Sequence, residues 1–418
     1  MLDRPKPFNI SKKLVWDAYQ LVKANKGGAG VDRESLAEFD KKRDSNLYKI
    51  WNRLSSGSYF PPVVRGVEIP KKQGGTRMLG VPTVSDRIAQ TTIKLMFEPL
   101  VEPHFLQDSY GYRPNKSALD AIGVTRKRCW SYDWLIEFDI RGLFDNIDHE
   151  LLMRAVRKHT TDKCILLYIE RWIKAPLEMP DGTVIDRTSG TPQGGVISPI
   201  LSNLFLHYVF DAWMTRNYPN APWCRYADDG ICHCETKEQA EALLLELKQR
   251  FNECKLEIHP EKTKIVYCKD GNRTDEDQGN TSFIFLGYEF RARGACNKQT
   301  KVVFTNFLPA ISPKAEKSIL EKIRSLHIKS RSDLSLQEIA KWINPMIQGW
   351  LNYYSRYTKS AMNKVLKRIN STLVAWSRRK YLKLRSRKVY AIKCMKDYAS
   401  KHANLFAHWK IGIIDVFI

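Results

Sequence analysis

The hydrophobic and polar positions of the chain change their period several times, which predicts a mixed α and β fold. Residues 11–60 follow a helical period, broken by the glycine-rich stretch 25–32, which we expect to form a loop. Residues 63–70 and 77–82 alternate like the two strands of a hairpin with a glycine-containing turn between them. A helix is then predicted over 84–100.

Two later strands each bring acidic residues to a chain reversal. The stretch 134–140 is apolar and ends near Asp139. The stretch 223–234 has apolar or thiol-bearing runs around Asp228 and Asp229, so we predict a hairpin with these acids at its tip. On these residues alone, an ordinary solvated hairpin loop has about even odds. Asp139, at the end of a similar strand, favours a functional site.

A glycine-rich turn is predicted over 189–195, and the polar side chain of Gln193 is expected to project from it. Ser198 and Pro199 are expected to open the next helix as its N-cap and first helical residue. That helix would present four apolar side chains to the core: Leu201, Leu204, Phe205 and Tyr208.

The pattern becomes helical beyond a boundary expected near residues 309–313. A capping box at Ser335 and Glu338 predicts a helix start, and Pro345 is expected to kink that helix. The predicted domains are 1–309, with an N-terminal extension within 1–60, then a helical domain over 310–382 and a short basic region over 383–418.

The charge balance points to a polyanionic partner. Lys and Arg number 68 against 45 Asp and Glu, giving a net charge of +23. Nucleic acid is the first candidate and an anionic membrane surface the second. Between residues 359 and 393 the chain has a dozen cations, no acid, and interleaved aromatic residues, which favours RNA or DNA binding. The cations there include Arg378, Arg379 and Lys380.

Composition also narrows the location and the chemistry. The chain lacks an apolar run long enough to span a bilayer, and its start lacks the apolar core of a signal peptide. Nine cysteines occur without a Cys-x-x-Cys pair. We therefore expect a cytoplasmic protein with reduced thiols, no membrane partner and no zinc site.

Three basic segments are candidate contacts for phosphate or bases. Lys71 and Arg77 flank a glycine turn and suit a triphosphate, although a solvated basic hairpin would be favoured if the stretch stood alone. Arg113 lies in a loop that mixes tyrosines with cations, which fits stacking on bases or packing beneath the loop. Lys26 lies in the glycine-rich loop, where a plain linker is favoured over a phosphate cradle.

Asp139, Asp228 and Asp229 together suggest a metal-dependent reaction. Clustered carboxylates repel one another unless cations lie between them, and Mg²⁺ prefers oxygen ligands. Two such ions can activate a 3′-hydroxyl group and neutralise a leaving pyrophosphate. Nucleotidyl transfer otherwise needs mainly positioning and charge neutralisation, so the pattern predicts a polymerase.

The motifs resemble those of the group II intron-encoded reverse transcriptase/maturase family over nearly the whole chain. They are Tyr226-Ala227-Asp228-Asp229, Gly190-Thr191-Pro192-Gln193-Gly194-Gly195, Phe138-Asp139 with Phe144, Tyr110-Gly111-Tyr112-Arg113-Pro114 and Gly349-Trp350-Leu351-Asn352-Tyr353-Tyr354. The resemblance implies a right-hand polymerase, α+β in class, with fingers and an antiparallel palm sheet before a helical thumb.

The resemblance also implies roles for individual residues. Asp139, Asp228 and Asp229 would be catalytic, and would bind two Mg²⁺ ions, or Mn²⁺ as a substitute, with the carbonyl group of Ile140. Lys71 and Arg77 would bind the nucleotide phosphates, and Gln193 would line the nucleotide pocket. Phe144 would exclude a ribose 2′-hydroxyl group, because a ring under the sugar leaves no room for it. Ile140-Arg141-Gly142-Leu143 departs from the family's usual sequence after this aspartate.

The implied partners are intron or other template RNA, a DNA primer or target, and deoxynucleoside triphosphates, with a homodimer as one state. The implied function is to copy RNA into DNA and to assist splicing and retrohoming. Two alternatives stay open on the sequence: an RNA-binding maturase without polymerase activity, and a domesticated or CRISPR-associated reverse transcriptase.

Overall fold

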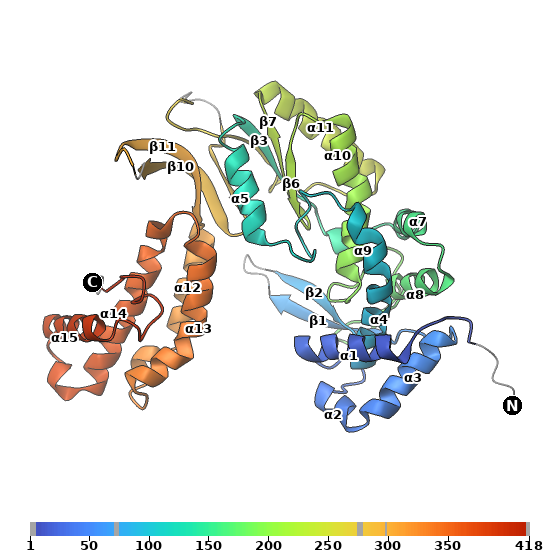
Figure 1. Cartoon of the computed structure of the whole chain (residues 1–418), viewed down its shortest axis with the longest axis horizontal. Helices are drawn as coiled ribbons and strands as arrows, with labels where there is room; N and C mark the ends of the chain where they lie inside the picture. The colour runs from blue at the N-terminus through green and yellow to red at the C-terminus, as the bar shows by residue number, and fades with distance from the viewer. Residues whose placement is uncertain (1–5, 71–74, 274–278, 297–298, 415–418) are drawn as a thin grey trace. The chain divides into compact units, whose positions relative to one another are not determined.

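The computed structural model describes residues 6–70, 75–273, 279–296 and 299–414 (Figure 1). The chain divides into two compact units, each built from helices and mostly antiparallel sheets. The first unit comprises residues 1–121 and 136–264, and the second comprises 122–135 and 265–418. The expected boundary near residues 309–313 lies inside the second unit.

The first unit begins with helices that surround a long central helix. Helix α1 starts where the Ser11 hydroxyl oxygen accepts a hydrogen bond from the amide of Leu14, and it ends at Asn25 before the glycine-rich loop, as predicted. It packs against α4, and α3 packs there too. The four helices are α1 (Lys12–Asn25), α2 (Leu36–Lys41), α3 (Arg43–Ser55) and α4 (Val84–Val101).

The predicted hairpin forms beside these helices. Strands β1 (Val64–Pro70) and β2 (Thr76–Val81) pair antiparallel, with Ile69 opposite Arg77. They belong to a sheet of order β2-β1-β4-β5, with the short strands β4 (Leu177–Glu178) and β5 (Val184–Ile185). Lys71 lies outside the described residues.

A second sheet carries the acidic segments. Its strand order is β6-β7-β3-β8. The strands are β3 (Trp134–Asp139), β6 (Trp223–Tyr226), β7 (Asp229–Cys234) and β8 (Lys264–Tyr267). The division between the two units passes through β3 and β8. Phe138 of β3 packs its ring edge-on against Phe210 and Phe251, with centroids 5.1 and 5.8 Å apart. Between α4 and β8 the chain also forms α5 (Ala118–Arg128), α6 (Leu143–Asn146), α7 (His149–His159), α8 (Lys163–Ile173), α9 (Ser198–Leu206), α10 (Ala212–Asn217) and α11 (Lys237–Glu253).

Helix α9 departs from its predicted form at both ends. Ser198 is not the N-cap: its hydroxyl group donates to the carbonyl oxygen of Pro192, and the helix has no side-chain cap. At the other end a π-helical segment, His207–Asp211, follows directly. A wider turn shifts the helical phase, so Tyr208 is only half-buried while Leu204 and Phe205 are buried.

The second unit combines a three-stranded antiparallel sheet with a helical bundle. Helix α13 begins at the predicted Ser335–Glu338 capping box and continues through Pro345 to Tyr354. The buried faces of the four helices form one apolar core with Trp376 and Trp409. The sheet order is β11-β10-β9, and the elements are β9 (Ser282–Phe285), β10 (Tyr288–Cys296), β11 (Val303–Ile311), α12 (Pro313–Ser325), α13 (Leu336–Tyr354), α14 (Asn363–Lys380) and α15 (Lys388–Lys401).

Two sequence predictions concern the chain as a whole. The nine cysteines are free thiols in this structure. In the described part of the chain, no helix combines the length and the apolar character needed to cross a bilayer.

Candidate active site

The β6–β7 hairpin places two acidic residues at a tight turn. Tyr226 pairs with Asp229, so Ala227 and Asp228 are the two turn residues. Ala227 has a φ of 56°, and the common two-residue hairpin turns have a positive φ at this first position. Gly230 follows because a Cβ atom there would lie 2.1 Å from the ring of Phe138. The predicted hairpin with acids at its tip is therefore confirmed.

A buried ion pair anchors this hairpin. The Arg225 and Asp211 side chains are both 0% exposed, and Nη2 of Arg225 lies 2.6 Å from Oδ2 of Asp211. The same guanidinium donates to Oδ1 of Asn203, to Oγ of Ser109 and to the carbonyl oxygen of Ala227. Sequence reasoning missed this pair. The signals were a lone arginine inside a short buried strand and a lone aspartate in an apolar helical run.

Backbone pairing brings Asp139 to the hairpin. The amide of Ile140 donates to the carbonyl oxygen of Asp228 at 3.2 Å, and the amide of His259 donates to the carbonyl oxygen of Asp139 at 2.8 Å. The carboxylate of Asp139 lies 3.0 Å from Nζ of Lys262. Residues that lie far apart in the sequence therefore meet at one edge of the sheet.

The three carboxylates share an excess of negative charge. Burial raises the pKa of the Asp229 carboxyl to about 7, and the charges of Asp228, Asp139 and Glu137 act in the same direction. The pKa of Asp228 is also raised, by burial first and then by Asp139. The Lys262 ammonium opposes both shifts. Added positive charge would therefore stabilise the ionised cluster.

The oxygen atoms of the acidic cluster are candidate ligands for a metal ion. Among the described residues, no group of three or more His, Cys, Asp and Glu side chains is arranged to hold one. The set implied by the resemblance is Asp139, Asp228 and Asp229 with the Ile140 carbonyl group, so its three carboxylates do not form such a group here. Hard oxygen donors and the raised pKa of Asp228 suit a cation here, and in this structure the Lys262 ammonium lies at Asp139 as such a cation.

The loop of Gln193 is tied to the segment of Phe144. Backbone hydrogen bonds run from Thr191 to the carbonyl of Phe144 and from Gly190 to that of Ile147. Nε2 of Gln193 donates to Oδ2 of Asp145 at 3.0 Å. A Cβ atom on Gly190 would meet the Phe144 carbonyl oxygen at 2.5 Å, so only glycine allows this approach.

Phe144 itself is half-buried and faces a tyrosine. Its ring lies edge-on to that of Tyr112, with centroids 6.4 Å apart. Tyr112 in turn is close enough to Asp228 for that charge to raise the pKa of its hydroxyl group, after burial as the main cause. Arg77, exposed on β2, acts on the same hydroxyl in the opposite sense.

A buried polar relay supports the Gln193 loop from α4. Asp86 is fully buried and accepts hydrogen bonds from Tyr59, Gln90 and Trp172 at 2.8–2.9 Å. The side-chain oxygen of Gln90 then accepts from the amide of Val196 at 2.8 Å. Nothing in the local sequence of α4 indicates Tyr59, Trp172 or Val196 as partners, because these residues lie outside that helix.

Two of the predicted nucleic-acid contacts, Lys26 and Arg113, make hydrogen bonds within the first unit. Lys26 is exposed, and its carbonyl oxygen accepts from Arg87, which fixes the loop to α4. The Arg113 side chain is only 8% exposed, pairs with Glu102 at 2.8 Å and donates to two carbonyl groups, so its contacts support a structural role.

In the second unit, three cations at the end of α14 contact neighbouring chain segments. Arg378 donates to the carbonyl of Arg385, Arg379 to the hydroxyl of Ser330, and Lys380 to the carbonyl of Leu334. Arg379 is exposed, and the other two are partly buried. These hydrogen bonds hold the end of the helix, and they leave positive charge at the surface.

Comparisons with known proteins place the chain in a family. Residues 69–290, more than half of the chain, match the family described as reverse transcriptase (RNA-dependent DNA polymerase). Residues 316–393 match the group II intron maturase-specific domain. The fold and the site thus define a protein of the reverse transcriptase class.

Individual relatives make the assignment more specific. Protein YkfC of Escherichia coli is 31% identical over 69% of this chain and 83% of its own length. The group II intron-encoded protein LtrA of Lactococcus lactis is 26% identical over 83% of this chain and 69% of its own length. The mitochondrial nuclear intron maturase 4 of Arabidopsis thaliana is 22% identical over 46% of this chain and 23% of its own length. The chain belongs to the group II intron reverse transcriptase/maturase family.

Proposed function

We propose that this protein is an RNA-directed DNA polymerase that also binds intron RNA. The observation that carries the proposal is the hydrogen bond from Ile140 to Asp228, because it brings Asp139 beside the acidic hairpin. The family match supports the same reaction. A growing 3′ end and an incoming deoxynucleoside triphosphate would meet at this edge of the sheet.

In this proposal Asp139, Asp228 and Asp229, with the Ile140 carbonyl, would hold two Mg²⁺ ions, with Mn²⁺ as a substitute. When bound, the ions lower the pKa of the attacking 3′-hydroxyl group and neutralise charge on the pyrophosphate. Asp229 supports the site through its charge. Arg225 holds the hairpin rigidly, which keeps the ligands in position.

The other predicted site residues would bind and select the nucleotide. Lys71 and Arg77 would contact the triphosphate, and Gln193 would line the pocket from its loop. The Phe144 ring would lie against the sugar and exclude a 2′-hydroxyl group, because it offers neither space nor a polar partner. Its half-buried position near Tyr112, which senses the charge of Asp228, supports this role.

RNA binding would involve the helical second unit. The maturase-specific match runs from α12 to the start of α15. It includes the basic stretch 359–393, which contains no acidic residue. We propose that these helices act as the thumb, that Lys26 contacts template RNA, and that residues 383–418 contact DNA. Assistance to splicing and to retrohoming would follow from binding intron RNA.

Primer extension on an RNA template with Mg²⁺ and deoxynucleotides tests the proposal. Wild-type protein should extend the primer, and Asp228→Asn should abolish extension while leaving RNA affinity largely unchanged. Glu241→Gln, a charge removal at an exposed position of α11, is the matched control and should extend normally.

Two outcomes would count against it. Tight RNA binding by a wild-type protein that extends no primer would favour a maturase without polymerase activity. Parallel loss of extension and RNA binding in Asp228→Asn would argue against a local metal role.

The log–log slope of RNA affinity against salt concentration should be steep, because each neutralised phosphate contributes roughly 0.7 to 0.9 to that slope.

A further inference from the structure

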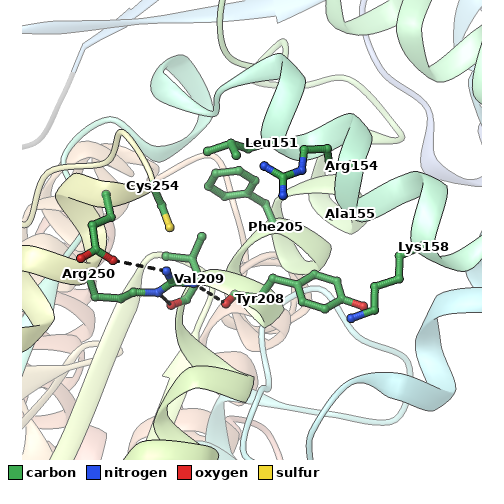
Figure 2. Close-up of a pocket in the computed structure, with 10 residues that line it drawn as sticks. Leu151, Arg154, Ala155, Lys158, Phe205, Tyr208, Val209, Arg250 and Cys254 are labelled. Atoms are coloured by element: carbon green, nitrogen blue, oxygen red, sulfur yellow. Dashed lines mark hydrogen bonds and ion pairs between the residues drawn. The ribbon is translucent and has the colours of Figure 1, made fainter.

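A pocket of about 400 Å³ lies in the first unit, between α7, α11 and the π-helical segment (Figure 2). Its floor is apolar, because Phe205, Val209 and Cys254 are buried there. Helix α7 contributes four residues spaced so that they share one face: Leu151, Arg154, Ala155 and Lys158. Such a volume and lining are typical of sites for small organic molecules.

Positive charge surrounds this apolar floor. Figure 2 shows Arg154 and Lys158 on one side and Arg250 on the other. Among the described lining residues Glu253 is the one carboxylate, and it lies 3.5 Å from Arg250. Arg154 and Lys158 are exposed, so their charges face solvent at the rim.

The walls of the pocket are held in place by hydrogen bonds. Arg250 donates to the carbonyl oxygens of Tyr208 and Val209 at 3.1 Å, in the π-helical segment. The Tyr208 hydroxyl lies 2.7 Å from Nε2 of His159. Nζ of Lys158 lies 4.6 Å from the centre of the Tyr208 ring. Because π-helical turns are frequent at functional sites, a built pocket beside one suggests a ligand.

We propose that this pocket binds a small organic anion with a flat apolar body. The apolar body would lie on Phe205, Val209 and Ala155. A charged phosphate chain would not favour contact with these apolar side chains. The anionic group would lie at the rim with Arg154 and Lys158. This inference does not depend on the proposed polymerase activity, because neither the aspartates nor the Gln193 loop lines the pocket.

Fluorescence titration of the full chain with 1-anilinonaphthalene-8-sulfonate tests the proposal. We expect saturable binding of one probe per chain. Ala155→Trp should fill the pocket and abolish that binding. Arg154→Gln and Lys158→Gln should each weaken it about two- to fivefold, as expected for partly exposed charges. These two variants change surface residues and should fold even if the pocket-filling variant does not.

Arg157 supplies the matched controls, because it is exposed on α7 and does not line the pocket. Arg157→Gln removes the same charge and Arg157→Trp adds the same bulk, and both should bind the probe like wild type. The neutral probe N-phenyl-1-naphthylamine should bind more weakly than the sulfonate. Thermal unfolding of each variant should verify that the fold is intact.

Several results would overturn the inference. Unchanged binding in both Ala155→Trp and the two charge variants would place the probe elsewhere. Equal losses in the Arg157 controls would reduce the effect to general charge or bulk. Displacement of the probe by RNA, with weaker RNA binding in Ala155→Trp, would make the pocket a nucleic-acid site instead.

Discussion

The side-chain oxygen of Gln90 accepts a hydrogen bond from the backbone amide of Val196 at 2.8 Å. The two residues belong to α4 and to the loop that carries Gln193. Gln90 is 2% exposed, and its amide nitrogen is itself bound to Asp86 at 2.9 Å. The interior of α4 therefore fixes the position of the loop that carries Gln193, for which we propose a role in nucleotide binding.

Replacing Gln90 with leucine should affect both stability and substrate binding. Val196 and Asp86 would each lose a partner in a buried region, so unfolding in urea should show a loss of about 1–3 kcal/mol. If the proposed function holds, KM for deoxynucleotides should rise more than kcat falls. Thr92→Val is the control, because it removes a buried hydrogen bond within α4 that does not reach the loop. An unchanged KM in Gln90→Leu would remove the positioning role.

Removing the buried cation Arg225 should be much more costly than removing a surface cation. Arg225→Met leaves Asp211 charged and unpaired in the interior, so the free energy of unfolding should fall by about 3–5 kcal/mol. Lys174→Met, which breaks an exposed pair with Glu170 at 2.7 Å, should cost less than about 1 kcal/mol. The double variant Arg225→Met/Asp211→Leu should recover part of the loss. A cost for Arg225→Met equal to that of Lys174→Met would contradict the anchor role.

The raised pKa of Asp229 predicts how stability depends on pH. Because the folded-state pKa is about 7 against an ordinary value of 3.8, the folded protein holds this proton more tightly than the unfolded chain. The free energy of unfolding should therefore decrease as pH rises from about 4 to about 7, and it should stay low above that range.

Asp229→Asn should flatten this profile and raise stability at pH 8 by on the order of 2–4 kcal/mol, as measured by urea unfolding at several pH values. Glu241→Gln should leave the profile as in wild type. Because the pKa of Asp228 is also raised and its charge acts on Asp229, the profile reports these two acids together. A variant profile as steep as that of wild type would show that Asp229 is not strained by its surroundings.

Shortening Phe144 should relax sugar selection. If the proposed function holds, Phe144→Ala opens the space beneath the sugar, so ribonucleotide incorporation relative to deoxynucleotide incorporation should rise about tenfold or more. Single-nucleotide extension with matched triphosphates measures this ratio. Phe60→Ala, at a phenylalanine that is 70% exposed, should leave the ratio unchanged. If Phe144→Ala keeps the wild-type ratio, another residue selects the sugar.

The sequence by itself determined the local elements. Alternation of side chains specified the hairpin at 64–81, the glycine run ended α1 at Asn25, and the capping box opened α13 at Ser335. The acidic hairpin was also predictable, because its apolar flanks and following glycine lie within one short stretch. These features depend on neighbours in the chain, and such neighbours are visible in the sequence.

Only the tertiary structure decided which distant residues meet. The pairing of Ile140 with Asp228, the burial of Arg225 on Asp211 and the reach of Gln90 to Val196 each join separate elements. The π-helical turn that moves Tyr208 into the pocket, and the carbonyl groups that engage Arg113, were likewise invisible to a periodic pattern. Charge and hydrogen-bonding capacity are properties of a residue type, but their partners are set by packing.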